Sequence, residues 1–290
     1  MSRSNRLPAQ LPRLLVERAV AAALEEDLGL AGDLTSQATL APEAKATASL
    51  SAREPGVIAG LDLAAAAFRL AGDGVAFSPK VTDGDRVAAG DLVATVTGPA
   101  RLVMSAERVA LNFLNHLSGI ATLTREYADA VAGTGAQICD TRKTTPGLRA
   151  FQKYAVRCGG GANHRYALDD AILIKDNHIA VAGGVTAAYK AAEAFAGHLV
   201  AIEIEVTTLP ELEEALAAGA RVVLLDNMDN ETLRQAVAIN AGRAKLEASG
   251  GVKLDRVRSI GETGVDYIST SQITMAAKPL DLGLDVVVER

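Results

Sequence analysis

Residues 201–226 read AIEIEVTTLPELEEALAAGARVVLLD, and this stretch contains a complete strand–helix–strand unit. Two short apolar runs end at Glu205 and Asp226, and a segment of helical composition, Leu209 to Ala218, joins them. Two strands joined by a crossover helix run parallel, because the helix returns the chain to the same edge of the sheet. The stretch therefore predicts a parallel α/β architecture.

The same alternation continues on both sides of this stretch, from Ala136 onward, at intervals of roughly 20 to 35 residues. Six such units, with no dinucleotide fingerprint after the first run, favour closure into a barrel over an open doubly wound sheet. Barrels of this type carry their chemistry at the carboxyl ends of the strands, so we expect the polar strand-end residues to meet on one rim. These residues are Thr141, Lys175, Glu205, Asp226, Ser249 and Thr270.

The first part of the chain follows a different pattern. Leu14 to Leu28 has the apolar spacing of an amphipathic helix, and Lys45 to Arg53 alternates like a half-buried strand. Arg101 to Val131 has the composition of one long helix, or two consecutive ones, that bridges the two halves. We therefore predict two domains, 1–132 and 133–290, with the extreme terminal segments free to cross between them.

Two features of the first half have alternative interpretations. Val75 to Thr97 resembles the hairpins of biotinyl and lipoyl carrier domains, but Lys80 lies only four residues before Gly84 rather than at the tip of a distant hairpin. The carrier interpretation is therefore disfavoured. On the long predicted helix, His116 lies on the same face as Arg108, two turns further along. A single histidine in such a position is more often packed and hydrogen-bonded than catalytic.

Composition limits the functional class. The formal net charge is −6 and the pI is near 5.3, which argues against nucleic acid as a partner. Cys139 and Cys158 form no CxxC pair. Glu17 and Arg18 interrupt the first apolar stretch, so no signal-peptide core is expected, and no run approaches the roughly 18 apolar residues of a membrane helix. We expect a cytoplasmic protein with no membrane partner.

Cations concentrate in residues 140–179, although the chain as a whole is acidic. Such a local concentration implies a small anionic ligand, because a general affinity for polyanions requires a basic surface. The alternative is a set of solvated loops that carry unrelated charges. The cations expected to line one side of the rim are Arg142, Lys143, Arg165 and Lys175, and His164 lies next to Arg165 in the sequence.

Carboxylates and glycine-rich turns complete the predicted rim. Glu205 and Asp226 among so many cations are typical of a site that holds Mg²⁺ against a phosphorylated sugar, or that orients ribose hydroxyls. The alternative is that both acids only neutralise the lysines. Backbone N–H groups at strand-to-helix turns bind phosphate, and two such turns occur late in the chain, at 249–251 and 269–271.

Long motifs spread over nearly the whole chain resemble the quinolinate phosphoribosyltransferase family. This resemblance implies an N-terminal α/β sandwich and an open, TIM-like α/β barrel, with homodimers in which two subunits complete each active site and with higher homo-oligomers allowed. It also implies the reaction of quinolinate with phosphoribosyl pyrophosphate to nicotinate mononucleotide, pyrophosphate and CO₂, with Mg²⁺, in the biosynthesis of NAD. The motifs are GDLTS (32–36), NFLNHLSGIAT (112–122), DTRKTTPGLR (140–149), KYAVRCGGGANHRYALDDAILIKDNH (153–178), IEIEV (202–206), LDNM (225–228) and EASGGV (247–252).

The resemblance also implies roles for individual residues. The catalytic residues would be Lys143, Lys175, Glu205 and Asp226, and the last two would serve Mg²⁺ largely through substrate and water. The neighbouring subunit would lend Arg108. Ser249, Gly250 and Gly251, with Thr270, Ser271 and Gln272, resemble the 5′-phosphate loops. The complete substrate-binding set would be Arg108, Thr141, Arg142, Lys143, His164, Arg165, Lys175, Glu205, Asp226, Ser249, Gly250, Gly251, Thr270, Ser271 and Gln272.

One departure and two rival functions accompany this resemblance. Many relatives have a glycine at the position of Ser271 and a histidine at that of Met275. One rival is a barrel aldolase or lyase that uses Lys175 as a Schiff-base amine. The other is a non-catalytic barrel that binds a phosphorylated metabolite as a sensor.

Overall fold

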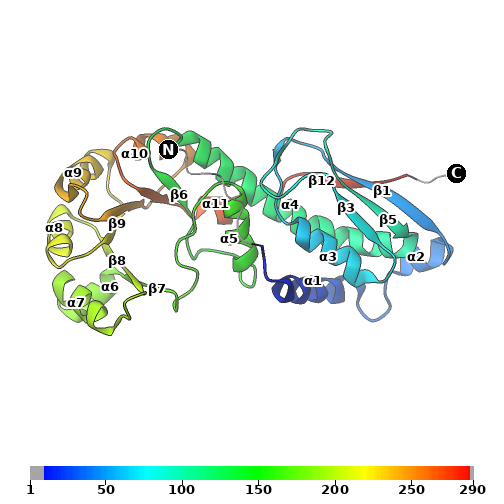
Figure 1. The fold of residues 1–290 in the computed structure, drawn as a ribbon, viewed down its shortest axis with the longest axis horizontal. Helices are drawn as coiled ribbons and strands as arrows, with labels where there is room; N and C mark the ends of the chain where they lie inside the picture. The colour runs from blue at the N-terminus through cyan, green and yellow to red at the C-terminus, as the bar shows by residue number, and fades with distance from the viewer. Residues whose placement is uncertain (1–9, 288–290) are drawn as a thin grey trace. The chain divides into compact units, whose positions relative to one another are not determined.

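The computed structural model describes residues 10–287 (Figure 1). The described chain forms two compact units, one of residues 10–123, 147–160 and 277–287, the other of Thr124–Pro146 and Gly161–Ala276. The units therefore alternate along the chain, whereas the sequence suggested a single boundary with terminal crossings. Residues 1–9, assigned to the first predicted domain, lie outside the described residues.

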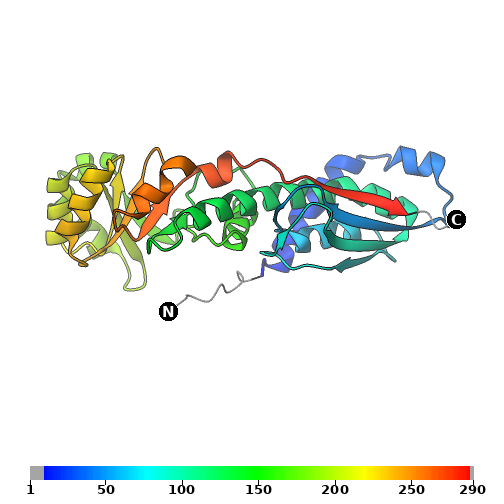
Figure 2. The same ribbon diagram turned by 90° about the horizontal axis from the view of Figure 1, so that it is seen from above.

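The first unit contains a four-stranded sheet in the order β12-β1-β5-β3, and every neighbouring pair is antiparallel. Strand β1 alternates between buried and more exposed residues, as predicted, because one side of the sheet faces the core. Figure 2 shows β12, in red, running along β1. The strands are β1 (Lys45–Ala52), β3 (Ala76–Pro79), β5 (Leu92–Pro99) and β12 (Leu282–Val287), and a separate pair is β2 (Gly56–Val57) with β4 (Arg86–Val87).

Helices of the first unit pack against one another and against its sheet. Helix α1 contacts α3, and α3 contacts β3. Helix α4 is a single helix of 31 residues, so the first of the two predicted alternatives is correct. His116 on α4 lies 2.9 Å from Gln152 on α5, between Nε2 atoms, and its burial lowers the pKa of the imidazole, as expected for a packed histidine. The helices are α1 (Arg13–Leu28), α2 (Leu34–Thr39), α3 (Leu61–Ala71), α4 (Ala100–Ala130) and α5 (Arg149–Cys158).

The second unit contains a six-stranded parallel sheet in the order β6-β11-β10-β9-β8-β7, with helices on its outer side (Figure 1). Each strand except β6 is followed by a helix of this unit, and α8 and α9 confirm the helices predicted at 209–218 and 230–241. The strands are β6 (Gln137–Cys139), β7 (Ala171–Ile174), β8 (Ala201–Val206), β9 (Val222–Asp226), β10 (Lys245–Ser249) and β11 (Tyr267–Ser269). The helices are α6 (Asp176–Ala182), α7 (Val185–Phe195), α8 (Leu209–Ala217), α9 (Asn230–Asn240), α10 (Leu254–Gly261) and α11 (Gln272–Met275).

The barrel is open between β6 and β7, which stand at the two ends of the strand order. The barrel that residue periodicity favoured over an open doubly wound sheet is confirmed, but it is not closed, as the family resemblance implied. The reason lies in α5, which follows β6 in the chain but belongs to the first unit. The chain returns at Ala162, which forms a parallel bridge with Cys139 at the end of β6.

Across residues 10–287, the structure contains no helix with both the length and the apolar character needed to span a membrane.

Candidate active site

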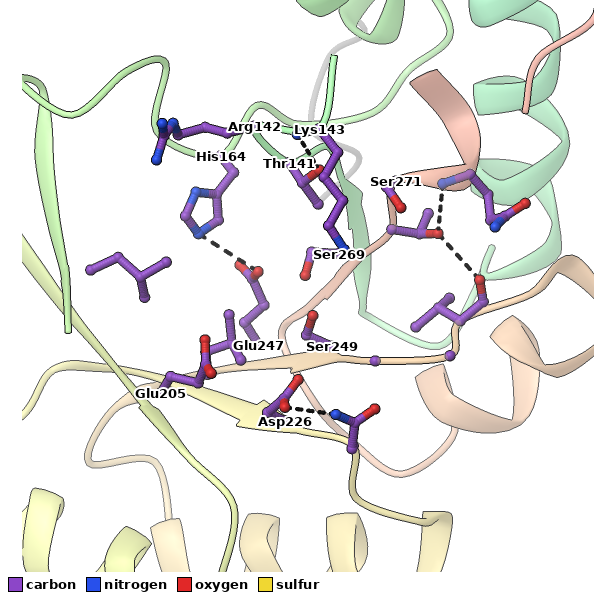
Figure 3. A pocket seen from close by; sticks show the side chains of 18 of the residues that line it. Thr141, Arg142, Lys143, His164, Glu205, Asp226, Glu247, Ser249, Ser269 and Ser271 are labelled. Carbon is purple, nitrogen blue, oxygen red and sulfur yellow. Dashed lines mark hydrogen bonds and ion pairs between the residues drawn. The ribbon is translucent and has the colours of Figure 1, made fainter. Parts of the chain in front are cut away.

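A cavity of about 700 Å³ lies at the carboxyl ends of the six parallel strands (Figure 3). All six polar strand-end residues line it, so the predicted rim is confirmed. Every other predicted site residue lines it as well, with the exception of Arg108. Arg108 lies on α4 in the first unit.

Arg142 and Arg165 both line the cavity. Arg165 Nη1 donates to the Ala171 carbonyl at 3.2 Å, and its buried Nε has no hydrogen-bond partner among the described residues. Burial first, and then the positive charge of Arg142, lower the pKa of the Arg165 guanidinium. Two guanidinium groups that repel each other in a partly buried place favour an anionic ligand between them.

Asp140 holds the segment that carries these groups. Its fully buried carboxylate accepts from Asn163 Nδ2 at 2.6 Å and from the His164 backbone N–H at 2.9 Å. Asp140 follows β6 directly, so its side chain fastens the returning chain beside that strand. This use of Asp140 places His164 and Arg165 at the rim.

His164 is engaged by the protein at both ring nitrogens. Its Nδ1 accepts from the Arg165 backbone N–H at 2.8 Å, and its Nε2 lies 2.7 Å from Glu203 Oε2. Because a backbone N–H can only donate, Nδ1 carries the lone pair and Nε2 carries the proton. His164 is therefore suited to orient Arg165 more than to bind a ligand carboxylate directly.

The acids and lysines of the rim differ in their pairing. Lys175 Nζ lies 3.1 Å from Glu205 Oε2, whereas Asp226 accepts from Asn227 Nδ2 at 2.7 Å and pairs with no described cation. Lys143 Nζ likewise pairs with no described carboxylate. The alternative that both acids only neutralise lysines therefore applies to Glu205 alone. Asp226 keeps carboxylate oxygens available for a hydroxyl or a hard cation.

The glycine turn after β10 has a backbone that only glycine suits. Gly250 has φ +94° and Gly251 has φ +59°. A Cβ on Gly250 would lie 2.9 Å from the backbone nitrogen of Asn227, well inside contact distance. The N–H groups of Gly250 and Gly251 have no hydrogen-bond partner among the described residues, so they are available to an anion.

The last loop is tied to this turn through Thr270. Its hydroxyl donates to the Val252 carbonyl at 3.2 Å and accepts from the Gln272 N–H at 3.2 Å. The hydroxyl therefore joins the two predicted phosphate loops. Of the two positions that depart from many relatives, Ser271 lines the cavity, and Met275 is exposed and does not line it.

Sequence reasoning missed several residues of the cavity. Glu247 lies two positions before Ser249 on β10, and a strand brings such neighbours to the same face. The same rule applies to Glu203, which lies two positions before Glu205 on β8 and contacts His164, although it does not itself line the cavity. Applying the two-residue period backward from each strand end would have found both acids. The other missed lining residues are Leu173, Leu224, Asn227, Val252 and Lys253, whereas Ser269 belongs to the turn predicted at 269–271.

Comparison with known proteins gives consistent matches. The family model for quinolinate phosphoribosyl transferase, N-terminal domain, matches residues 33–118, and the model for the C-terminal domain matches residues 120–285. The chain is 44% identical over 263 residues to the probable nicotinate-nucleotide pyrophosphorylase [carboxylating] of Bacillus subtilis, covering 91% of this chain and 90% of the relative. It is 45% identical over 269 residues to the nicotinate-nucleotide pyrophosphorylase [carboxylating] of Mycobacterium leprae, covering 91% and 94%.

A solved structure agrees with these sequence matches. The crystal structure of NadC from Streptococcus pyogenes matches with a TM-score of 0.93 and 42% identity, covering 97% of this chain and 100% of that one. Two family models that together span most of the chain, and relatives well above 40% identity, leave one conclusion. The chain belongs to the quinolinate phosphoribosyl transferase family.

Proposed function

We propose that this protein transfers the phosphoribosyl group of phosphoribosyl pyrophosphate to quinolinate, with decarboxylation, and so makes nicotinate mononucleotide for NAD biosynthesis. The observation that carries this proposal is the cavity at the strand ends, where cations from separate βα units and two carboxylates line one space. Both substrates are polyanions, and a chain of net charge −6 binds them only where its cations are gathered.

Arg142 and Arg165 would hold the two carboxylates of quinolinate. Arginine forks bind carboxylates bidentately, and the partly buried setting strengthens these bonds. His164 would fix the backbone of Arg165 through its 2.8 Å hydrogen bond. The pyridine nitrogen would then face the middle of the cavity, where the sugar binds.

At the middle of the cavity the pyridine nitrogen would bond to C1′ as the bond from C1′ to pyrophosphate breaks. Lys143 and Lys175 would stabilise the negative charge that develops on pyrophosphate, and Glu205 and Asp226 the positive charge on the ribose. Loss of CO₂ from C2 leaves its electron pair beside the positive ring nitrogen, and a proton then adds at C2. The pyridinium ring is its own electron sink, so this step needs no organic cofactor.

We also propose Mg²⁺ as the cofactor. Carboxylate oxygens are the ligands that this ion prefers, and Asp226 has no cationic partner among the described residues. Glu205 and Asp226 would hold the ion, which would neutralise the phosphate oxygens of the sugar substrate.

The 5′-phosphate of the sugar would bind at the other end of the cavity, on the loops at Ser249–Gly251 and Thr270–Gln272. The N–H groups of Gly250 and Gly251, which have no partner within residues 10–287, favour an anion there. We propose a homodimer in which Arg108 reaches the site of the partner subunit, because Arg108 does not line the cavity of its own second unit. A cytoplasmic location also stays a prediction.

The rival aldolase is disfavoured by the environment of Lys175. A Schiff-base lysine is activated by desolvation or by a neighbouring cation. The Lys175 side chain is instead 49% exposed and paired with the Glu205 carboxylate at 3.1 Å. Borohydride treatment with a carbonyl substrate should therefore leave no reduced adduct on the protein.

Product analysis tests the proposed function. Purified protein incubated with quinolinate, phosphoribosyl pyrophosphate and Mg²⁺ should form nicotinate mononucleotide and pyrophosphate in equal amounts. A sensor would bind the sugar without forming nucleotide. Nucleotide formation that does not require Lys143 or Asp226 would contradict the residue assignments while preserving the function.

A further inference from the structure

Three side chains beside the arginines form a largely buried cluster, of which the proposed reaction uses only the histidine. They are His164, Glu203 on β8 and Glu247 on β10, and one nitrogen or oxygen of each lies within 4.8 Å of the others. Glu203 is 8% exposed and Glu247 is 5% exposed. Glu247 and His164 also line the cavity (Figure 3).

The composition of this cluster resembles a metal site, but its geometry does not suit one. Because Nδ1 of His164 accepts from a backbone N–H, the imidazole carries its proton on Nε2, which points at the two carboxyl groups. A nitrogen that carries a proton has no lone pair for a cation. The cluster instead presents one N–H donor to two buried acids.

The two acids share this donor unequally. Nε2 lies 2.7 Å from Glu203 Oε2 and 3.8 Å from Glu247 Oε1, so only Glu203 accepts a hydrogen bond. The buried Glu247 Oε1 has no hydrogen-bond partner among the described residues. Glu203 Oε1 also has no partner among the described residues, so each acid has one hydrogen-bonded oxygen, which contacts His164 in Glu203 and Ser269 in Glu247. Two ionised carboxylates this close in a buried place repel strongly, and Glu247, which is the more buried and the farther from the imidazole, takes up a proton.

The surroundings of Glu247 point in the same direction. Burial, and then the negative charge of Glu203, raise the pKa of Glu247 to about 7. The imidazole of His164 and the hydrogen bond with Ser269 on β11 oppose this rise, and the charge of Asp140 after β6 adds to it.

We propose that Glu247 is a positioning residue that keeps its proton while quinolinate is bound, and that loss of this proton weakens quinolinate binding. This inference rests on the proposed function. An ionised Glu247 would add a further buried negative charge near Arg142 and Arg165, where it would compete with the ligand carboxylates. Quinolinate would then bind the protonated form preferentially, so its Kd would increase as the pH rises above neutrality.

Calorimetric titration of the wild-type protein and of Glu247→Gln with quinolinate alone, between about pH 6 and pH 9, tests this proposal. The carboxylates of quinolinate are ionised throughout this range, so the ligand adds no titration of its own. For the wild type, Kd should increase by up to about tenfold per pH unit above neutrality, with uptake of about one proton per ligand. Glu247→Gln carries no titrating group here, so its Kd should stay constant and its binding heat should not depend on the buffer.

Two further variants make the experiment decisive. Glu231→Gln, at an exposed carboxylate paired with Arg234, should keep the wild-type pH dependence. Ser269→Ala removes a hydrogen bond that lowers the pKa of Glu247. In this variant the Kd for quinolinate should therefore begin to increase at a higher pH than in the wild type. Ser269→Ala serves as the test if Glu247→Gln does not fold.

The outcomes separate the two proposals. A Glu247→Gln protein that binds quinolinate with the wild-type pH slope and proton uptake overturns the inference alone. The same holds if the Kd of Ser269→Ala begins to increase at the same pH as that of the wild type, or at a lower one. A wild-type protein that binds no quinolinate at any pH overturns the proposed function, and the inference with it.

Discussion

Arg142 is the residue whose loss separates binding of the two substrates most clearly. Figure 3 shows its guanidinium near His164 and away from Ser249, where the turn that we propose for the sugar phosphate begins. In Arg142→Ala we expect the KM for quinolinate to increase roughly 10- to 100-fold, as for loss of a charge-assisted bidentate pair. The KM for phosphoribosyl pyrophosphate should change less than about threefold, because that substrate binds elsewhere.

Steady-state kinetics with each substrate varied in turn would measure this difference. Arg234→Ala, at an exposed arginine paired with Glu231 on α9, is the matched control and should leave both constants unchanged. An unchanged KM for quinolinate in Arg142→Ala would remove that residue from the dicarboxylate site.

Glu247 also makes the stability of the fold depend on pH. Its folded-state pKa of about 7 lies above the ordinary value of 4.5, because of burial and then the charge of Glu203. The stabilisation linked to its proton is fully present below pH 4.5 and is lost as the pH rises through about 7. Wild type should therefore lose stability relative to Glu247→Gln, on the order of 2 to 4 kcal/mol, over this interval.

Urea unfolding of both proteins at pH 5 and pH 8 checks this effect, since the difference between them cancels the titration of other groups. A difference in free energy of unfolding that is the same at both pH values would show that Glu247 does not titrate in the folded protein.

At the residue scale, the sequence identified the charged groups that end strands but not the acids behind them. Strand-end residues such as Lys175 and Asp226 stand out because apolar runs stop at them. Glu203 and Glu247 lie inside their strands, where an isolated acid looks like the polar half of an alternating pattern. Only the packing of three strands and the return segment shows that both face His164.

Among the elements, boundaries were predictable where local sequence controls them. Strands β9 and β10 end at the predicted residues, Asp226 and Ser249. Strand β6 ends at Cys139, two residues before the predicted Thr141, because Asp140 turns to hold the returning chain. That departure depends on a contact with residues more than 20 positions later, which no local pattern contains.

The placement of two other elements depends on contacts between segments that are far apart in the chain. Strand β12 pairs with β1, at the opposite end of the chain, and was not predicted as a strand. Helix α5 follows β6 in the chain but packs in the first unit, so it leaves the barrel open. Neither placement follows from the composition of the segment itself.

The turn after β10 should tolerate no side chain at Gly250. In Gly250→Ala, a methyl group would be forced against Asn227 at a backbone φ of +94°. We expect the KM for phosphoribosyl pyrophosphate to increase at least about tenfold, because the turn that presents the N–H groups must shift, whereas quinolinate affinity changes little.

Gly219→Ala is the matched control for this substitution. Gly219 has nearly the same φ, +97°, but a Cβ there meets nothing within 4 Å. It should cost about 1 kcal/mol of stability without affecting the KM of either substrate. Equal kinetic effects from the two variants would attribute the loss to backbone strain rather than to a phosphate site.

For the whole molecule, the proposed sharing of Arg108 between subunits predicts complementation. Arg108→Ala and Lys143→Ala should each be nearly inactive as purified proteins. After the two are mixed and allowed to exchange subunits, about half of the dimers would be mixed, and each mixed dimer would hold one intact site of two. Activity should then recover to about a quarter of the wild-type value.

The mixing experiment is read against each variant incubated alone under the same exchange conditions. No recovery, despite subunit exchange demonstrated by native mass spectrometry, would place Arg108 and Lys143 in the same site or remove Arg108 from the reaction.

In the proposed reaction, quinolinate is joined to the ribosyl group and then loses CO₂ within one cavity. Quinolinate labelled in its C2 carboxylate measures this most directly. Labelled CO₂ should appear only when phosphoribosyl pyrophosphate and Mg²⁺ are both present, in an amount equal to the nucleotide formed. Release of labelled CO₂ without the sugar, or nucleotide that retains the label, would contradict the proposed reaction.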